Sequence, residues 1–222
     1  MIINDCVLDL ENSIDVEPGA ATWIDQSRYK DNGTITAGAG GWVQLPSGLW
    51  VMQFDGAATV VDLGNDPSVM QDVLTISCWV KYEDTGMWNP FVTWKNGTDR
   101  PGILFEAAAN SPIMYFGATN YRYFTGAPLV NDGTWRMFTC LITGWGTNDI
   151  LNNTMYVDAT ALTPGAFNNA GAPNAKVNLY LGRTATSLNG KIALNRWWNY
   201  LLTPGQIRNN YEKTKYLFGR FD

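Results

Sequence analysis

The chain has 222 residues, of which 45% are hydrophobic and 16% charged, and it contains 22 glycines and 10 prolines. This composition is typical of many short strands joined by turns, and it excludes a disordered chain. A net charge of −5 with scattered lysines and arginines excludes nucleic acid as the expected partner, because phosphate binding needs clustered cations. No apolar run approaches the roughly 20 residues that span a bilayer, so we expect no membrane insertion.

The N-terminal segment MIINDCVLDLENS carries Asp5 and Asp9 where a secretory signal needs a basic stretch and a long apolar stretch. We therefore expect synthesis in the cytoplasm without a signal peptide. Cys6, Cys78 and Cys140 each alternate with apolar residues, which predicts that all three thiols point into the core. An odd number of buried free cysteines fits a reducing compartment better than a disulfide framework.

Strand-like motifs follow one another along the chain, each beside turn residues. In chain order they are Trp23–Ser27 with Asp31–Thr34, Met52–Ala57 with Val60–Leu63, the strand LTISCWVK at Leu74–Lys81, the turn Asp132–Trp135 with the apolar strand after it, and Met155–Asp158. Trp197 and Trp198 are adjacent within a later strand, so their rings should point to opposite faces of a sheet.

A helix N-terminal capping motif follows those strands. Thr203 can act as the N-cap, a proline takes the first helical position, and Gln206 completes a T-x-x-Q capping box. Ile207 and Tyr211 repeat at helical spacing. This pattern predicts a single short helix over residues 204–214.

In this order the motifs resemble the laminin-G-like and pentraxin-like branch of the concanavalin A-like lectin/glucanase superfamily. The segments Met52–Ala57, Leu74–Lys81 and Met155–Asp158 are similar to the family patterns F-D-G, L-T-I-S-x-W-V-K and L-Y-V-D-G. Two departures stand out. Arg136-Met137 replaces the family's usual histidine pair, and Ala193-Leu194-Asn195 replaces the acidic residues that commonly follow Gly-Lys-Ile.

The resemblance implies an all-β fold: a two-sheet antiparallel jelly-roll sandwich, concanavalin A-like, with one short C-terminal helix. Residues 1–222 would form one laminin-G-like domain. The first strand, near Cys6–Leu10, would lie beside the late strands around residues 178–182 and 191–198.

The sequence contains no histidine, which excludes Ser-His and Cys-His catalysis and imidazole metal ligands. Retaining glycoside hydrolysis needs two carboxyl groups about 5 Å apart, which glycosidases of this fold supply as E-x-D-x-x-E. The glutamates, at positions 11, 17, 83, 106 and 212, show no such spacing, and adjacent Glu83 and Asp84 would point to opposite faces of a strand. We therefore predict that the protein is not an enzyme.

A structural calcium ion is one cofactor that the resemblance implies, although none is required. The family pattern would bring Asp25, Asn32 and Asp55 to one end of the sandwich, and calcium prefers such oxygen ligands. The alternative is that these residues build turns: Asp25 and Asp31 would form Asx-turns and Asp55 would cap an Asp-Gly turn.

Aromatic side chains in turn-like segments are the candidate binding residues, and they are Trp88, Trp94, Tyr121, Tyr123 and Trp145. Flat rings beside asparagine and glycine suit a sugar-binding loop, and they suit a subunit interface equally well. The alternative is that these rings cover the ends of the core, because Trp and Tyr are usually well buried.

Two functions remain open. The first is a non-enzymatic structural or interaction protein on a virion surface, such as a phage decoration, head-fibre or tail-adhesion protein. Its partners would be other virion or assembly proteins, in an oligomer, and a surface glycan. The second is a carbohydrate-binding lectin module of an extracellular or adhesive protein. The free thiols and the absence of a signal favour the first, because virions are assembled inside the cell and act outside it.

Overall fold

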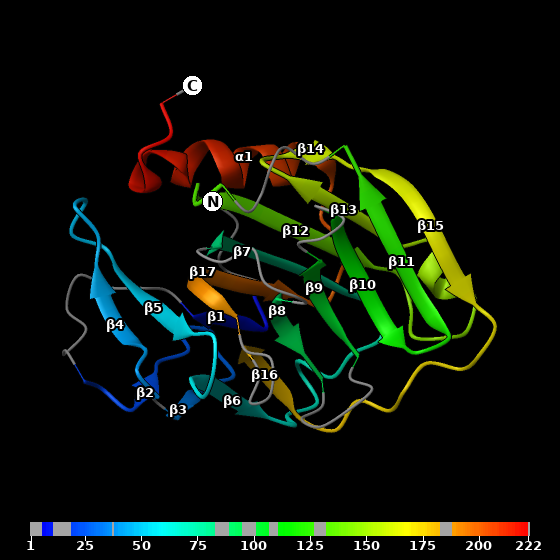
Figure 1. Cartoon of the computed structure of the whole chain (residues 1–222), viewed down its shortest axis with the longest axis horizontal. Helices are drawn as coiled ribbons and strands as arrows, with labels where there is room; N and C mark the ends of the chain where they lie inside the picture. The colour runs from blue at the N-terminus through cyan, green and yellow to red at the C-terminus, as the bar shows by residue number, and fades with distance from the viewer. Residues whose placement is uncertain are drawn as a thin grey trace.

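Two antiparallel sheets face each other in the computed structural model, which describes residues 6–10, 19–36, 38–82, 89–94, 101–106, 111–126, 132–182 and 188–221 (Figure 1). Sheet A contains, in spatial order, β14 (Thr160–Ala161), β13 (Thr154–Val157), β12 (Arg136–Ile142), β7 (Leu74–Tyr82), β17 (Asn189–Trp198), β5 (Trp50–Asp55) and β4 (Gly41–Gln44), and β1 (Leu8–Leu10) also pairs with β17. Sheet B contains β15 (Thr163–Asn169), β11 (Asn120–Thr125), β10 (Ser111–Gly117), β9 (Gly102–Glu106), β8 (Asn89–Thr93), β16 (Leu179–Gly182), β6 (Val60–Gly64), β3 (Gly33–Thr36) and β2 (Thr22–Trp23). The predicted jelly-roll sandwich is confirmed.

The main core fills the space between the two sheets. Alternation along each strand sends one set of side chains inward, so Phe138 of sheet A packs against Phe91 of sheet B, with 5.3 Å between ring centroids, and Ile76 and Phe105 belong to the same core. Trp197 belongs to the same core. These side chains have no exposed surface, and their burial is the main stabilising contribution to the sandwich.

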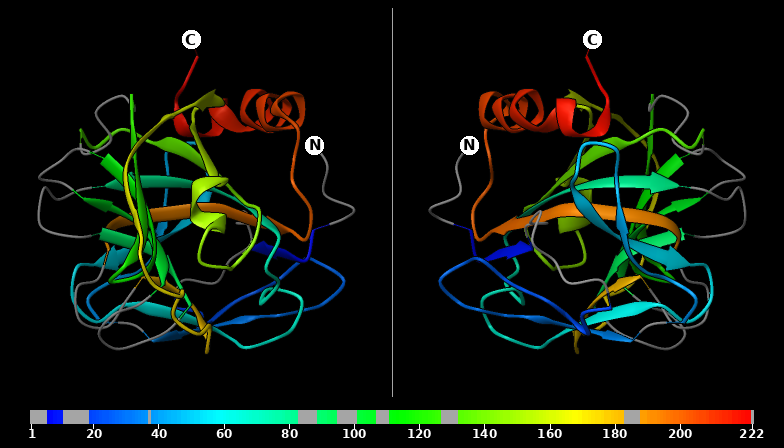
Figure 2. Two further views of the ribbon diagram at one scale, coloured as in Figure 1. Left: turned by 90° about the vertical axis from the view of Figure 1, so that its right-hand side faces the viewer. Right: turned by 90° about the vertical axis from the view of Figure 1, so that its left-hand side faces the viewer.

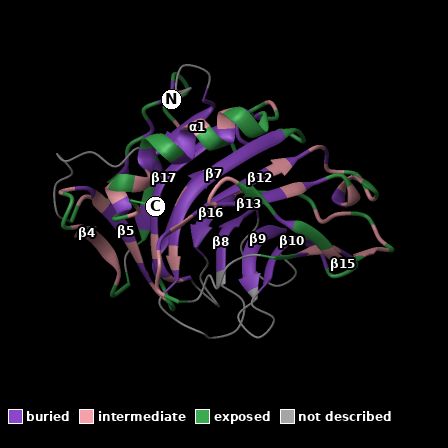
Figure 3. Ribbon diagram, turned by 90° about the horizontal axis from the view of Figure 1, so that it is seen from above, coloured by how far each residue is buried: buried purple, intermediate pink, exposed green. Residues whose placement is uncertain are grey.

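The helix α1 (Pro204–Thr214) covers the outer face of sheet A. Its predicted capping box is present: the Gln206 backbone N–H donates to the Thr203 hydroxyl, and the Gln206 side chain accepts from the Thr203 backbone N–H. Ile207 and Tyr211 face the sheet, where the Tyr211 ring stacks on Trp79 with the centroids 5.7 Å apart. Seen from above, α1 lies over β17 and β7, and its ribbon carries both buried and exposed residues (Figure 3).

The chain continues from α1 into a short 3-10 helix, η2 (Lys215–Phe218), whose Phe218 ring also stacks on Trp79, at 4.3 Å between centroids. Trp198 lies in this second cluster beneath the helices, while Trp197 lies between the sheets, which confirms that the two rings point to opposite faces. Both views of Figure 2 show the helical segment on one side of the stacked strands. None of the helices in the described ranges is long and apolar enough to cross a membrane.

The position of the first strand differs in part from the prediction. β1 pairs with β17, with Leu8 opposite Trp197, as expected. The late strand β16 does not lie beside β1, because it belongs to sheet B, between β6 and β8. β1 can pair with β17 because β5 pairs only with residues 189–192 of that strand and leaves its second half free for another partner. A bulge around Leu194, whose φ is 47°, separates the two halves.

All three cysteines are buried and none forms a disulfide, as the alternation predicted. Cys78 and Cys140 lie in the core between the sheets, and Cys6 lies in the cluster under α1. Burial raises the pKa of the Cys78 thiol. Burial is also the main cause of the raised pKa of the Cys140 thiol, and the nearby Cys78 adds a smaller effect in the same direction. Such thiols stay protonated, so these two side chains act as small core residues and not as nucleophiles.

Candidate functional site

Asp25 is fully buried and joins three segments through its carboxylate. Its Oδ1 accepts the backbone N–H groups of Asp9 and Ser27, both at 2.8 Å. Its Oδ2 accepts the Ser27 hydroxyl at 2.6 Å and the Asp31 backbone N–H at 2.8 Å. Asn32 contributes as well, since its Oδ1 accepts the Asp25 backbone N–H at 2.8 Å. Each of these oxygens is therefore used in closing the loop before β3.

Asp55 closes a different loop, between β5 and β6. Its Oδ1 accepts the backbone N–H groups of Ala57, Ala58 and Thr59, at 3.0, 3.0 and 2.9 Å, and its Oδ2 accepts that of Ala39 at 2.8 Å. Burial by itself would raise the pKa of Asp55, but these four donors together hold that pKa well below its usual range. The side chain behaves as an anionic cap for the turn.

These contacts favour the alternative interpretation, in which the predicted calcium ligands build turns. Asp25 and Asn32 meet in one loop, but none of the hydrogen-bond partners of Asp55 belongs to that loop. Within the described ranges, no three acidic or cysteine side chains gather as a metal-binding group. As placed, the three residues do not fit one calcium site. Calcium binding stays a prediction, which a thermal melt in EDTA and in millimolar Ca²⁺ tests.

Two of the predicted binding tryptophans cover the end of the core. Trp94 has no exposed surface, and its ring lies 5.1 Å from Trp145 and 5.7 Å from Trp197 between centroids. Trp145 is half-buried, stacked at 4.0 Å on Phe116 and capped by the Lys176 ammonium 4.7 Å from its ring centre. Trp94 therefore presents nothing to a ligand, contrary to the prediction, and Trp145 is largely occupied by internal partners. Their turn-like sequence neighbours gave no sign of which way the rings point.

Other predicted residues cannot be placed. Trp88 lies outside the described residues, as do Glu83 and Asp84, and the Glu106 side chain is not described.

Tyr121 and Tyr123 come together on the outer face of sheet B, and Tyr115 joins them. Tyr115 on β10 lies directly opposite Tyr121 on β11, with the rings nearly parallel at 9° and 6.3 Å apart. Tyr123 meets Tyr121 edge-on at 5.7 Å. All three side chains are half-buried. We call these three residues the tyrosine surface.

The strand neighbours hold the tyrosine surface outward. Met114 and Phe116 flank Tyr115 and point into the core, so Tyr115 must point away from it. On β11, the Arg122 guanidinium turns the other way and donates to the carbonyls of Ile150 and Leu151. Since α1 covers sheet A, this outer face of sheet B is the one that the helix leaves open.

An asparagine completes the edge of this surface. Asn168 on β15 lies directly opposite Tyr121, and residues opposite each other on neighbouring strands share a face. Rings flanked by an amide can combine stacking with hydrogen bonding. Neither Tyr115 nor Asn168 was a candidate from the sequence. Tyr115 could have been found from the alternation in SPIMYFG, but its pairing with Tyr121 depends on strand register.

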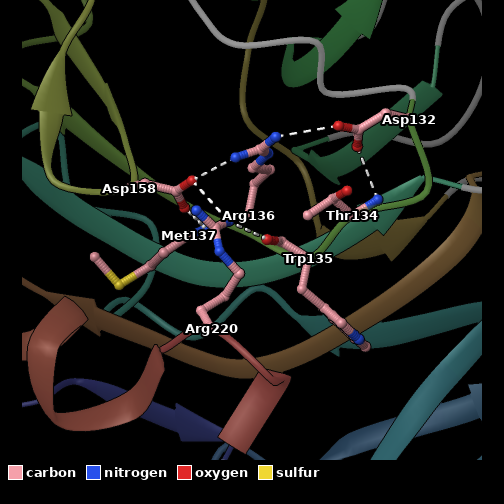
Figure 4. A network of polar contacts seen from close by, with 7 residues as sticks. All are labelled: Asp132, Thr134, Trp135, Arg136, Met137, Asp158 and Arg220. Carbon is pink, nitrogen blue, oxygen red and sulfur yellow. Dashed lines mark hydrogen bonds and ion pairs between the residues drawn. The ribbon is translucent and has the colours of Figure 1, made fainter. Parts of the chain in front are cut away.

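A second polar cluster lies at the far end of sheet A and is a structural tie (Figure 4). The Asp158 Oδ2 receives the guanidinium of Arg136 at 3.0 Å and that of Arg220 at 3.1 Å. Its Oδ1 accepts the Met137 backbone N–H at 2.9 Å. Arg136 also pairs with Asp132 at 3.1 Å. Arg136 and Met137, which replace the family's histidine pair, thus share Asp158 with Arg220, and this carboxylate fastens the C-terminal segment to β12.

Comparisons with solved structures find the same fold at low sequence identity. Domain 4 of the extracellular arabinanase AbnA of Geobacillus stearothermophilus, in complex with arabinotriose, has a TM-score of 0.66 and 15% identity over 92% of this chain and 97% of that domain. Trypanosoma rangeli sialidase has a TM-score of 0.66 and 14% identity over 96% of this chain. The binding domain of botulinum neurotoxin DC in complex with SialylT has a TM-score of 0.59 and 11% identity, over 96% of this chain and 52% of that one.

The chain spans only 33% of the sialidase, so that comparison concerns one part of a larger protein. No curated protein matches the sequence. A sequence profile described as the concanavalin A-like lectin/glucanases superfamily, of laminin-G type, matches residues 55–208, which cover most strands of both sheets. The chain belongs to the concanavalin A-like lectin/glucanase superfamily.

Proposed function

We propose that this protein binds carbohydrate without converting it, and that the tyrosine surface is the binding site. The observation that carries the proposal is the stacked pair of Tyr115 and Tyr121, with Tyr123 beside them, on the sheet face that α1 leaves open. Sugar rings have apolar C–H faces that pack on aromatic rings, while hydroxyl groups need polar partners at the rim. Asn168, opposite Tyr121, would supply its side-chain NH₂ group as such a partner, since its Oδ1 accepts the Ala170 backbone N–H at 2.9 Å.

Structures with this fold support the class of ligand. One similar structure, the arabinanase domain, is in complex with arabinotriose, and another, the neurotoxin binding domain, is in complex with SialylT. At 15% and 11% identity these likenesses concern the fold, so the ligand of this chain is part of the proposal.

The absence of turnover is part of the proposal too. The chain has no histidine, and the carboxylates of Asp25, Asp55 and Asp158 each accept several protein donors. These protein donors leave little lone-pair capacity on the carboxylate oxygens for contact with a substrate. The purified protein should release no product from a polysaccharide panel. Turnover that is lost in Glu83→Gln or Glu106→Gln would contradict this.

Binding can be tested by calorimetry with arabinotriose and a sialylated oligosaccharide. Tyr121→Ala should weaken binding by about 2 kcal/mol, roughly thirtyfold, because central aromatic rings carry much of the energy of a binding surface. Tyr216→Ala is the matched control, since Tyr216 is 56% exposed on η2, which packs with α1 on the other sheet. Equal effects of the two substitutions, or no binding of either sugar, would rule out the tyrosine surface as the site.

We further propose that the protein acts on a virion surface, bound to other structural proteins. Three buried free thiols support synthesis in a reducing compartment, which suits a particle assembled in the cytoplasm. A lectin module of an extracellular protein is the alternative. Antibody labelling of intact purified particles separates the two: a virion protein should be labelled on the particle, and an extracellular module should not.

A further inference from the structure

A second candidate site lies at the other end of the sandwich from the tyrosine surface. A pocket of about 300 Å³ opens between β4, at the edge of sheet A, and β3 of sheet B with the segment before β2, and it is lined by Gly19, Ala20, Ala21, Ile35, Gly40, Gly41 and Trp42. In Figure 1, β4 and β2 lie toward the left and β11 toward the right. The volume of this pocket is at the lower end of the roughly 300–1,000 Å³ found for small-molecule sites.

The indole of Trp42 forms the aromatic wall and is held in place by the fold. Its Nε1–H donates to the Ala20 carbonyl at 3.2 Å. Its ring meets Trp23 edge to face, with 5.3 Å between centroids and 77° between planes. Trp23 is buried while Trp42 is only half-buried, so Trp42 has a fixed orientation and an accessible surface. A ring fixed in advance loses little conformational entropy when a ligand stacks on it.

The remaining walls are backbone and small side chains. Gly40 has no room for a side chain, because a Cβ there would lie 2.4 Å from the Gln53 carbonyl and 2.5 Å from the Thr59 hydroxyl. Gly19 and Gly41 have φ values of 86° and 147°, and a Cβ on either would meet nothing within 4 Å. The glycines therefore bring peptide groups to the pocket wall and leave the space in front of them open.

The chemistry of this lining indicates an uncharged ligand with one apolar face. None of the described lining residues carries a charge, and a charged ligand would lose hydration there without gaining a partner. An indole suits a ring with C–H groups on one face, and the open mouth lets hydroxyl groups stay in water. We propose that this pocket binds one neutral sugar residue stacked on Trp42, at a site separate from the tyrosine surface.

The test follows the Trp42 indole N–H signal in ¹H–¹⁵N spectra of the whole protein, assigned by its loss in Trp42→Phe. Titration with glucose, galactose, arabinose and N-acetylglucosamine should shift this signal saturably for at least one sugar. Ala21→Leu places a larger side chain on the pocket wall and should weaken that binding at least tenfold. Ala161→Leu is the matched control, since Ala161 is also exposed but lies on β14. It should leave binding unchanged.

Ala20→Leu is a second filling variant, in case Ala21→Leu disturbs the loop. Tyr121→Ala should leave the Trp42 titration unchanged, which separates failure of this site from failure of the tyrosine surface. The proposal is overturned if no neutral sugar shifts the Trp42 signal, or if binding persists in both filling variants. A shift caused only by apolar compounds such as phenol would also overturn it.

Discussion

Ala159 adopts a left-handed backbone conformation in the two-residue turn between β13 and β14. Asp158 and Ala159 have φ values of 49° and 61°, as a type I′ turn requires, and Asp-Gly is the preferred sequence for such a turn. The Cβ of alanine costs about 1 kcal/mol in this conformation. Ala159→Gly should therefore raise the free energy of unfolding by about 0.5–1 kcal/mol, measured by urea denaturation.

Ala161→Gly, two residues further on in β14, is the control for that substitution. Glycine in a strand has more conformational freedom to lose on folding, so this change should lower stability. If Ala159→Gly lowers stability as well, the left-handed turn is not a source of strain.

Asp55 should make the stability of the protein depend on pH in the acid range. Burial by itself would raise the pKa of this carboxyl group, but hydrogen bonds from the backbone N–H groups of Thr59, Ala57, Ala39 and Ala58 lower the pKa in the folded state. A depressed folded-state pKa gives stability that is complete above the unfolded-state value of about 3.9 and is lost as the pH falls below it. Asp55→Asn should be less stable than the wild type at pH 7, and the difference should shrink at pH 2.5.

Urea unfolding at the two pH values measures this effect. Asp72→Asn is a suitable control, because the Asp72 side chain is 69% exposed and pairs with the Lys176 ammonium. A wild type and an Asp55→Asn variant that lose the same stability on acidification would contradict the assignment.

At the scale of elements, the tie between the C-terminal segment and the β13–β14 turn should stabilise the covered face of sheet A. Arg220 donates both to the Trp135 carbonyl and to Asp158, each at 3.1 Å, and its side chain is only 16% exposed. Arg220→Ala should lower the free energy of unfolding by about 1–2 kcal/mol, since it removes hydrogen bonds that involve a charged group. Arg208→Ala, on the exposed side of α1, should change it by less than about 0.5 kcal/mol.

The buried Trp94 ring at one end of the sandwich should contribute to stability as a core residue does. Trp94→Ala removes a ring with no exposed surface, packed against Trp145 and Trp197, and should lower stability by about 3–5 kcal/mol. Tyr121→Ala should leave the melting temperature nearly unchanged. A pair of melts compares the two variants directly, and a fully stable Trp94→Ala protein would show that the ring does not support the core.

At the scale of the whole molecule, local patterns predicted much of the fold. Period-two alternation placed Cys78 in the core and Trp197 and Trp198 on opposite faces of β17, and the capping box located the start of α1. Both signals depend on neighbours a few residues apart. The sheet to which β16 belongs could not be predicted this way, because its partners β6 and β8 are distant in the sequence.

The candidate sites were harder to predict for the same reason. Turn-like composition marked Trp94 and Tyr121 alike, yet one lies in the core and the other on the outer face of sheet B. Strand register brings Tyr115 to Tyr121, and the packing of the two sheets brings the Trp42 indole to the Ala20 carbonyl. Composition carries no information about such pairings.

The place of β17 in sheet A has a consequence for biosynthesis. This strand lies between β7 and β5 and also pairs with β1, yet it is translated after all of them. Until residues 189–198 leave the ribosome, the edges of β5 and β7 that it will join have no strand to pair with. Closure of the sandwich must therefore wait for nearly the whole chain, and the emerging polypeptide exposes unpaired edges and apolar surface meanwhile. A ribosome that pauses shortly before β17 would prolong the time during which these edges are open to pairing with another chain.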